Sequence, residues 1–190
     1  TYDRNSNRLT KTVDGEITSY IYNELNQLVS ETGITYEYDL NGNLIKKTEA
    51  TQTTVYTYNA QNRLIRVTIQ SGQQVNVEEY LYDYAGNRIA KIGEFSTIYY
   101  LVDTNGALSQ VLAEYDENGS LTTLYTRGDE LISQERGGEK HYYLYDGFDS
   151  IRMPTDEGGS VTDTYTFDAF GNITDSTGAV SYTHLRAHET

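Results

Sequence analysis

The 190-residue sequence contains no cysteine and no tryptophan, and it has one proline and one methionine. The lack of cysteine excludes disulfides, thiolate metal ligands and cysteine nucleophiles. No run approaches the roughly 18 consecutive apolar residues of a membrane-spanning helix. Basic residues are also scarce, with 14 Lys plus Arg against 28 Asp plus Glu and a net charge of −14. Such a charge repels phosphate backbones and anionic membranes, so we expect no nucleic-acid partner and no membrane span.

Histidine is the next scarce residue, and two of the three histidines, His184 and His188, lie in the last eleven residues, VSYTHLRAHET. When this segment is reverse-translated, it resembles the adaptor of transposon-based sequencing libraries. We therefore interpret residues 180–190 as a tail that is not native. The two histidines have the spacing of a helical zinc site, but a terminal peptide is the favoured interpretation.

Candidate catalytic residues are few in the remaining sequence. His141 stands beside Tyr142 in a strand-like run, where an ordinary sheet residue is favoured over a catalyst. Carboxylate pairs such as Asp146 and Asp149 are explained by turns, and the serines lack a nearby histidine. The acids around Asp116 lack the ligand spacing of a calcium loop, so only weak calcium binding stays open. We predict no catalytic, cofactor-binding or metal residues, and no enzyme.

Tyrosine is abundant, with 19 residues, and most tyrosines belong to a recurring pattern seen in YEYDLNGNLI, residues 36–45. In each copy an aromatic residue is followed directly by Asp or Asn, and the fourth residue after the aromatic is one that tolerates a positive φ. The aromatics are Tyr2, Tyr22, Tyr38, Tyr58, Tyr82, Tyr115, Tyr145 and Phe167. The following residues are Asp3, Asn23, Asp39, Asn59, Asp83, Asp116, Asp146 and Asp168. The later ones are Ser6, Asn26, Gly42, Asn62, Gly86, Gly119, Asp149 and Gly171, of which Ser6 departs from the preference.

This pattern predicts a hairpin unit. Two aromatics that alternate along a strand lie on the same sheet face, and Asp or Asn begins a turn. A type I turn followed by a left-handed residue forms a common three-residue hairpin loop. Weaker copies lie at residues 102–108 and 155–161, and Asp14-Gly15, Ser71-Gly72 and Gly137-Gly138 suit two-residue hairpins. The sequence therefore predicts an all-β fold of repeated antiparallel hairpins that must stack to be stable.

The repeats YEYDLNGNLIKKTE, YTYNAQNRLIRVT and YLYDYAGNRIAKI resemble RHS repeats, also called YD repeats. These occur in bacterial RHS and toxin-complex proteins and in animal teneurins. Residues 143–173 are similar to the RHS-associated core region, with Asp149 where that family usually has glycine. The matching core positions are Tyr145, Asp146, Gly147, Ser150, Ile151, Arg152, Phe170 and Gly171. We thus divide the chain into a repeat array (1–142), the start of the core region (143–179) and the tail (180–190).

The resemblance implies a curved, spiralling sheet that forms part of a hollow shell around a C-terminal toxin or effector. It implies an extracellular or cell-envelope location, no cofactor, and two partners: the neighbouring repeats and the protein's own C-terminal domain. The alternative is an adhesion module whose tyrosines stack on glycans. The sequence begins within the pattern, so the front of the chain looks cut. We expect self-association through unpaired outer strands.

Overall fold

The computed structural model describes residues 1–147, 150–168, 171 and 173–178, and these residues form strands and turns without any helix. The predicted all-β fold of antiparallel hairpins is confirmed. The first strands are β1 (Thr10–Val13), β2 (Glu16–Tyr22), β3 (Leu28–Glu31), β4 (Ile34–Tyr38), β5 (Leu44–Thr48), β6 (Gln52–Tyr58), β7 (Leu64–Ser71), β8 (Gln74–Tyr82) and β9 (Arg88–Gly93). The others are β10 (Thr97–Asp103), β11 (Gln110–Tyr115), β12 (Leu121–Arg127), β13 (Leu131–Arg136), β14 (Glu139–Tyr145), β15 (Ile151–Thr155), β16 (Thr164–Phe167) and β17 (Ile173–Thr177).

The order of strands in space follows the order in sequence. Strands β1 to β15 belong to a 15-stranded sheet in which neighbours in sequence are neighbours in space, and β16 pairs with β17. The chain divides into two compact units, Thr1–Thr97 and Ile98–Thr190. In the part of the chain that the structure describes, no helical segment has the length and hydropathy that a bilayer crossing requires.

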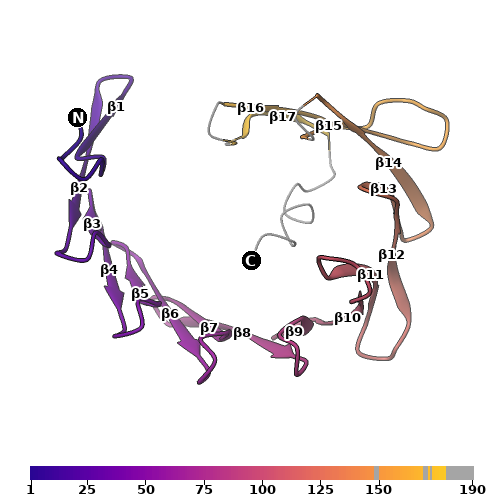
Figure 1. The fold of residues 1–190 in the computed structure, drawn as a ribbon, viewed down its shortest axis with the longest axis horizontal. Helices are drawn as coiled ribbons and strands as arrows, with labels where there is room; N and C mark the ends of the chain where they lie inside the picture. The colour runs from indigo at the N-terminus through magenta and orange to yellow at the C-terminus, as the bar shows by residue number, and fades with distance from the viewer. Residues whose placement is uncertain (148–149, 169–170, 172, 179–190) are drawn as a thin grey trace. The chain divides into compact units, whose positions relative to one another are not determined.

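The first unit repeats one strand pair per motif. Its strands β2 to β9 follow one another along an arc (Figure 1). The motif turns join β2 to β3, β4 to β5, β6 to β7 and β8 to β9, so all four lie at the same edge of the sheet. This placement follows from the even number of strands between successive motifs.

Tight turns occupy the opposite edge of the first unit. Asp14 and Gly15 connect Val13 to Glu16, and both have positive φ, as predicted for a two-residue hairpin. The Ser71-Gly72 prediction is wrong by one residue, because Ser71 still pairs with Gln74 and the loop consists of residues 72–73. Glycine at the first loop position, with φ of 59°, sets this register.

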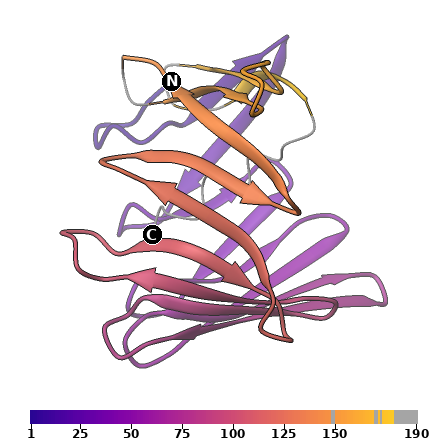
Figure 2. The same cartoon turned by 90° about the vertical axis from the view of Figure 1, so that its right-hand side faces the viewer.

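The second unit uses the same motif with another spacing. The Tyr115 motif joins β11 to β12, whereas the Tyr145 motif joins β14 to β15. Three strands separate the two turns, so they lie at opposite edges of their sheet. Figure 2 shows the antiparallel hairpins of this unit in pink and orange. The predicted Gly137-Gly138 hairpin connects Arg136 to Glu139.

The second unit also contains the hydrophobic cluster. Tyr125, Leu131 and Tyr143 are buried together on β12, β13 and β14. Val111, Tyr145 and Ile151 pack against these three residues. In the first unit the strand tyrosines are mostly half-buried, and the residues between them, such as Ile21 and Leu81, are exposed. The first unit is thus a thin sheet with one aromatic face, and the second has a small core.

Candidate functional site

The repeated turn, which we call the corner, is the feature that the sequence pattern singled out. In the Tyr38 copy, the backbone N–H of Asp39 donates to the Asn43 carbonyl at 2.9 Å, and the Gly42 N–H donates to the Asp39 carbonyl at 3.1 Å. Oδ1 of Asp39 accepts from the N–H groups of Asn41 (2.9 Å) and Asn43 (2.8 Å). One carboxylate thus satisfies two backbone donors of the loop, which explains why an acid or amide follows the aromatic.

The acid or amide also selects the residue four places later. Oδ2 of Asp39 accepts from Nδ2 of Asn43 at 2.9 Å, and Asp83 and Asn87 form the same pair at 2.7 Å. In the Tyr22 copy the bond is reversed: Nδ2 of Asn23 donates to Oε1 of Gln27 at 2.7 Å. An acid that only accepts is therefore paired with an amide donor, and an amide donor with an amide acceptor.

Seven of the corners carry a register shift at their aromatic residue, whereas the Tyr2 corner has an isolated bridge between Tyr2 and Arg8. The shifts follow Ile21, Glu37, Thr57, Leu81, Glu114, Leu144 and Thr166. The left-handed position has positive φ in Ser6, Asn26, Gly42, Asn62, Gly86, Gly119 and Gly171. Ser6 adopts a φ of 68° although its residue type departs from the preference, so the loop overrides the propensity. Asp149 and Phe170 lie outside the described residues.

The tyrosine directly before the acid or amide of a corner forms a hydrogen bond to the strand that follows an earlier turn. The tyrosine hydroxyl donates to the backbone carbonyl of the aliphatic residue that opens the strand after that turn. These bonds join Tyr38 to Leu28 (2.9 Å), Tyr58 to Leu44 (3.0 Å), Tyr82 to Leu64 (2.7 Å) and Tyr145 to Leu131 (2.7 Å). The tyrosine therefore connects successive hairpins as well as packing between them.

Side chains also link corners directly along the edge of the first unit. We call residues 3–7, 23–27, 39–43, 59–63 and 83–87 the corner row. Oδ1 of Asn26 accepts from Nδ2 of both Asn5 and Asn7 at 2.9 Å. Oδ1 of Asn62 likewise accepts from Asn41 at 3.0 Å and Asn43 at 2.9 Å. Polar side-chain contacts therefore join corner 3–7 to corner 23–27 and corner 39–43 to corner 59–63.

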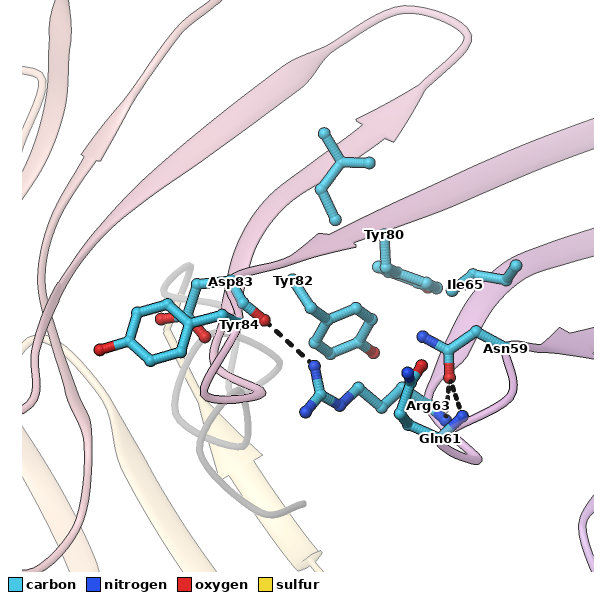
Figure 3. Close-up of a pocket in the computed structure, with 9 residues that line it drawn as sticks. Asn59, Gln61, Arg63, Ile65, Tyr80, Tyr82, Asp83 and Tyr84 are labelled. Carbon is cyan, nitrogen blue, oxygen red and sulfur yellow. Dashed lines mark hydrogen bonds between the residues drawn. The ribbon is translucent and has the colours of Figure 1, made fainter.

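Arg63 continues the corner row to the next repeat and borders a pocket of about 560 Å³ (Figure 3). Its Nη1 donates to the Asp83 carbonyl at 3.1 Å, and its guanidinium lies 5.9 Å from the ring centroid of Tyr82. Tyr80 lines the pocket and is half-buried, whereas Tyr84 is fully exposed. The pocket thus combines aromatic rings with one cation and amide groups.

Hydrogen bonding and burial shift several pKa values in these corners. The amide of Asn43 and then the backbone N–H groups hold the pKa of Asp39 below its usual value. The pKa of Asp83 is lowered in the same way, with Asn87 as the main cause. Burial raises the pKa of the Tyr38 and Tyr58 hydroxyls. The corners therefore favour charged aspartates and neutral tyrosines.

Sequence reasoning missed a shorter turn in the second unit, in which the Gly128 N–H donates to the Glu130 carbonyl at 2.8 Å. Arg127 occupies the place of the first aromatic, two residues after Tyr125, and pairs with Leu131 across a register shift. Its Nε donates to the Val111 carbonyl at 3.2 Å, in the way that a tyrosine hydroxyl does elsewhere. The alternation of Tyr125, Arg127 and Leu131 was the available signal, but the missing aromatic concealed it.

The Tyr115 and Tyr145 corners keep the same turn chemistry. Oδ1 of Asp116 accepts from the N–H groups of Asn118 (2.9 Å) and Ser120 (2.8 Å). Oδ1 of Asp146 accepts from the Ser150 N–H at 3.1 Å. Gly147 has an ordinary φ and open space around a Cβ, so its backbone imposes no need for glycine.

Arg152 connects the Tyr145 corner to β16. Its Nε donates to Oδ2 of Asp146 at 2.7 Å, and Nη1 reaches the Tyr165 carbonyl at 3.5 Å. The guanidinium lies 5.1 Å from the ring centroid of Phe167, the aromatic of the last corner. In that corner the Gly171 N–H donates to the Asp168 carbonyl at 3.1 Å. Arg152 is therefore the link between the two core-region corners.

A buried carboxylate lies beside the cluster of the second unit. The carboxylate of Glu114 accepts from Thr123 Oγ1 (3.1 Å), the Tyr125 hydroxyl (2.8 Å) and Nη2 of Arg136 (2.9 Å). Glu114 is only 7% exposed. Three donors, of which Arg136 is also a cation, compensate for the loss of water around this charge. The sequence pattern gave no sign of this network.

No cluster of three or more acids and histidines that could hold a metal ion occurs among the described residues. His141 lies on β14 opposite Gln134. The corner carboxylates accept the N–H groups of their own loops. The arrangement is suited to holding strands together rather than to acid–base chemistry.

The sequence matches the family described as Teneurin YD-shell over residues 1–185, and the chain belongs to this family. It is 33% identical over 107 residues to the tRNA3(Ser)-specific nuclease WapA of Bacillus spizizenii, and 34% identical over 107 residues to the tRNA nuclease WapA of Bacillus subtilis. These matches cover 55% of this chain and 4% of each relative.

Two crystal structures resemble this fold. TcdB2-TccC3-TEV has a TM-score of 0.46 and 13% identity, covering 94% of this chain and 13% of that one. TcdB2-TccC3 without its hypervariable C-terminal region has a TM-score of 0.46 and 12% identity, covering 96% and 16%.

Proposed function

We propose that this chain is a wall segment of a β-shell that encloses the C-terminal toxin or effector of a bacterial RHS-type protein, secreted or delivered at the cell surface. The observation that carries the proposal is the family match over residues 1–185. In this role the corner residues are structural, and the chain's partners are the adjoining repeats and the enclosed polypeptide. The proposed boundaries at residues 142 and 179 belong to the same hypothesis.

The contacts between repeats support a wall. The tyrosine bonds to backbone carbonyls and the bonds to Asn26 and Asn62 join one hairpin to another, as in Tyr58 to Leu44 and Asn43 to Asn62. Stability in such an array is approximately a sum of repeat terms and nearest-neighbour terms. A wall built in this way can be extended by adding hairpins without a separate core.

The named activity of the relatives supports the toxin context. Both WapA proteins are named as nucleases, and this chain covers 4% of their length. We assign the present segment a non-catalytic part, because its carboxylates hold turns and its pattern is explained by strand pairing.

Protease protection in the complete protein tests enclosure. The full-length protein is digested, and the survival of its C-terminal domain is compared with that of the same domain expressed alone. We expect slower digestion inside the shell, and faster digestion when Gly86→Arg opens the corner row. Gly147→Ala serves as the matched control, since its site has ordinary φ and open space. Equal digestion rates for enclosed and isolated domains would refute the proposal.

The pocket beside Arg63 favours a second candidate, a glycan-binding adhesion surface. Tyr80, Tyr82 and the exposed Tyr84 offer ring faces, and Asn59 and Gln61 offer amides for sugar hydroxyls. A glycan array with the wild type and a Tyr84→Ala variant tests this candidate. Binding that the variant abolishes would support adhesion, and silence across a broad array would count against it.

A further inference from the structure

Three Asn-Gly pairs lie in turns of this protein: Asn41-Gly42, Asn105-Gly106 and Asn118-Gly119. Asparagine followed by glycine is prone to deamidation, because glycine has no Cβ to hinder attack by its own backbone nitrogen. The three pairs are chemically alike but differ in how the structure holds the two reacting groups. This difference permits a residue-specific inference.

Deamidation needs only water. The glycine backbone nitrogen gives its proton to solvent and bonds to Cγ of the preceding asparagine. The bond from Cγ to Nδ2 breaks, and the side-chain nitrogen takes up a proton and leaves as ammonia. One water molecule then opens the cyclic imide at either carbonyl, giving aspartate or isoaspartate. No oxidation or reduction occurs.

Both groups are restrained at Asn41. The attacking nitrogen of Gly42 donates to the Asp39 carbonyl at 3.1 Å. The leaving amide of Asn41 donates to Oδ1 of Asn62, 21 residues away on the next corner, at 3.0 Å. The reaction requires both bonds to open, so the complete corner protects this pair.

At Asn118, only the attacking nitrogen of the following glycine is restrained. The Gly119 N–H donates to the Asp116 carbonyl at 3.1 Å, as in the Tyr38 corner. The Asn118 side-chain amide has no hydrogen-bond partner among the residues that the structure describes. Here the turn alone opposes the reaction.

At Asn105, in the loop between β10 and β11, the attacking nitrogen is the group that is not restrained. The Gly106 N–H has no backbone partner within the described part of the chain, and Gly106 does not have the positive φ of a corner glycine. The leaving amide of Asn105 donates to Oδ1 of Asp103, the last residue of β10, at 2.8 Å, so this group is held while the attacking nitrogen is not. The weak motif copy thus lacks the turn bond of the full copies.

We propose that Asn105 and Asn118, where one of the two reacting groups is restrained, are sites of spontaneous deamidation in the folded protein, and that Asn41, where both groups are restrained, is protected by the corner row. Each hydrogen bond that must open slows the reaction by about tenfold, if its net contribution is of the usual size. Modification of Asn105 places a second negative charge beside Asp103 in the loop that precedes β11.

The test is peptide mapping by mass spectrometry after the native protein has been aged in ¹⁸O-labelled water at mildly alkaline pH. The same protein aged in urea supplies the intrinsic rate of each pair. We expect faster conversion at Asn105 and Asn118 than at Asn41 in the native protein, and similar rates at all three pairs in urea. Native rates at Asn41 equal to those at the other two pairs, or the same difference in urea, would overturn the proposal.

A variant pair isolates the inter-corner bond. Asn62→Gly keeps the left-handed backbone accessible and removes the acceptor, so conversion at Asn41 should rise about tenfold while that at Asn105 stays unchanged. Asn62→Asp retains an acceptor oxygen at this position and should leave Asn41 slow. Faster conversion in both variants, or in neither, would contradict the assigned protection.

Discussion

The two units of this chain use one motif but are stabilised differently. In Thr1–Thr97, the corners recur at one edge, and the contacts that join them are side-chain hydrogen bonds between neighbouring repeats. In Ile98–Thr190, the corners at Tyr115 and Tyr145 lie at opposite edges, and a buried cluster and a buried carboxylate carry the packing. A regular repeat can dispense with a core, whereas an irregular array needs one.

The largest expected effect lies in the second unit. Glu114→Ala removes the acceptor of Thr123, Tyr125 and Arg136, so buried donors lose their partner. We expect the free energy of unfolding of this unit to fall by about 3 kcal/mol. Hydrogen exchange of the β12 amides measures the change. Glu117→Ala, at an exposed corner tip, should change little; similar losses for both variants would argue against the network.

A corner glycine of the first unit should have the next largest effect. Gly86 has a φ of +101°, and a Cβ there would lie 2.9 Å from Nη2 of Arg63. We expect Gly86→Ala to destabilise the first unit by about 2 kcal/mol, measured by urea unfolding. Gly147→Ala is the matched substitution in the second unit and should be nearly neutral. An equal effect of the two would show that glycine conformation does not set the corner.

A single tyrosine hydroxyl should contribute less. Tyr58→Phe removes the bond to the Leu44 carbonyl and keeps the ring, so we expect a loss of about 1 kcal/mol. Tyr84→Phe is the control, because this side chain is fully exposed. If the two variants have the same stability, the hydroxyl bond between hairpins contributes nothing measurable.

Lowering the pH is expected to have the smallest effect on the stability of the fold. The pKa values of Asp3, Asp39 and Asp83 are lowered in the fold, chiefly by side-chain hydrogen bonds from Asn7, Asn43 and Asn87. The unfolded chain then binds more protons, so this stabilisation is present above a pH of about 4 and is lost as the pH falls through the lower folded values. Urea midpoints measured across this range check the sign. Asp83→Asn should reduce the slope; an unchanged slope would contradict the assignment.

The local part of this structure was predictable from sequence. A corner is decided within six residues, so Asp39, Gly42 and the aliphatic after them suffice to predict the loop. The assignment of the flanking segments to β-strands followed from the alternating tyrosines. The Ser71 error was a shift of one residue, which the turn dipeptide alone could not resolve.

The contacts between repeats were not predictable in the same way. Asn62 accepts from Asn41 and Asn43 only because the register brings neighbouring corners together. Arg127 takes the place of an aromatic residue because its side chain is long enough for Nε to donate to the Val111 carbonyl. Glu114 accepts a hydrogen bond from Arg136, which lies 22 residues later in the sequence. Such partners depend on strand register and on long-range placement, which residue patterns do not encode individually.

Asn23 donates to Gln27, whereas Asp39 accepts from Asn43, and this reversal of the same corner hydrogen bond has an evolutionary consequence. Asp39→Asn alone would bring two amide groups together in the geometry of an acid–amide pair, whereas a simultaneous Asn43→Gln would reproduce the arrangement of Asn23 and Gln27. These two positions are therefore expected to co-vary among related proteins where an amide stands four places after the acid or amide, whereas corners with Arg63 or Ser120 at that place are free of this constraint.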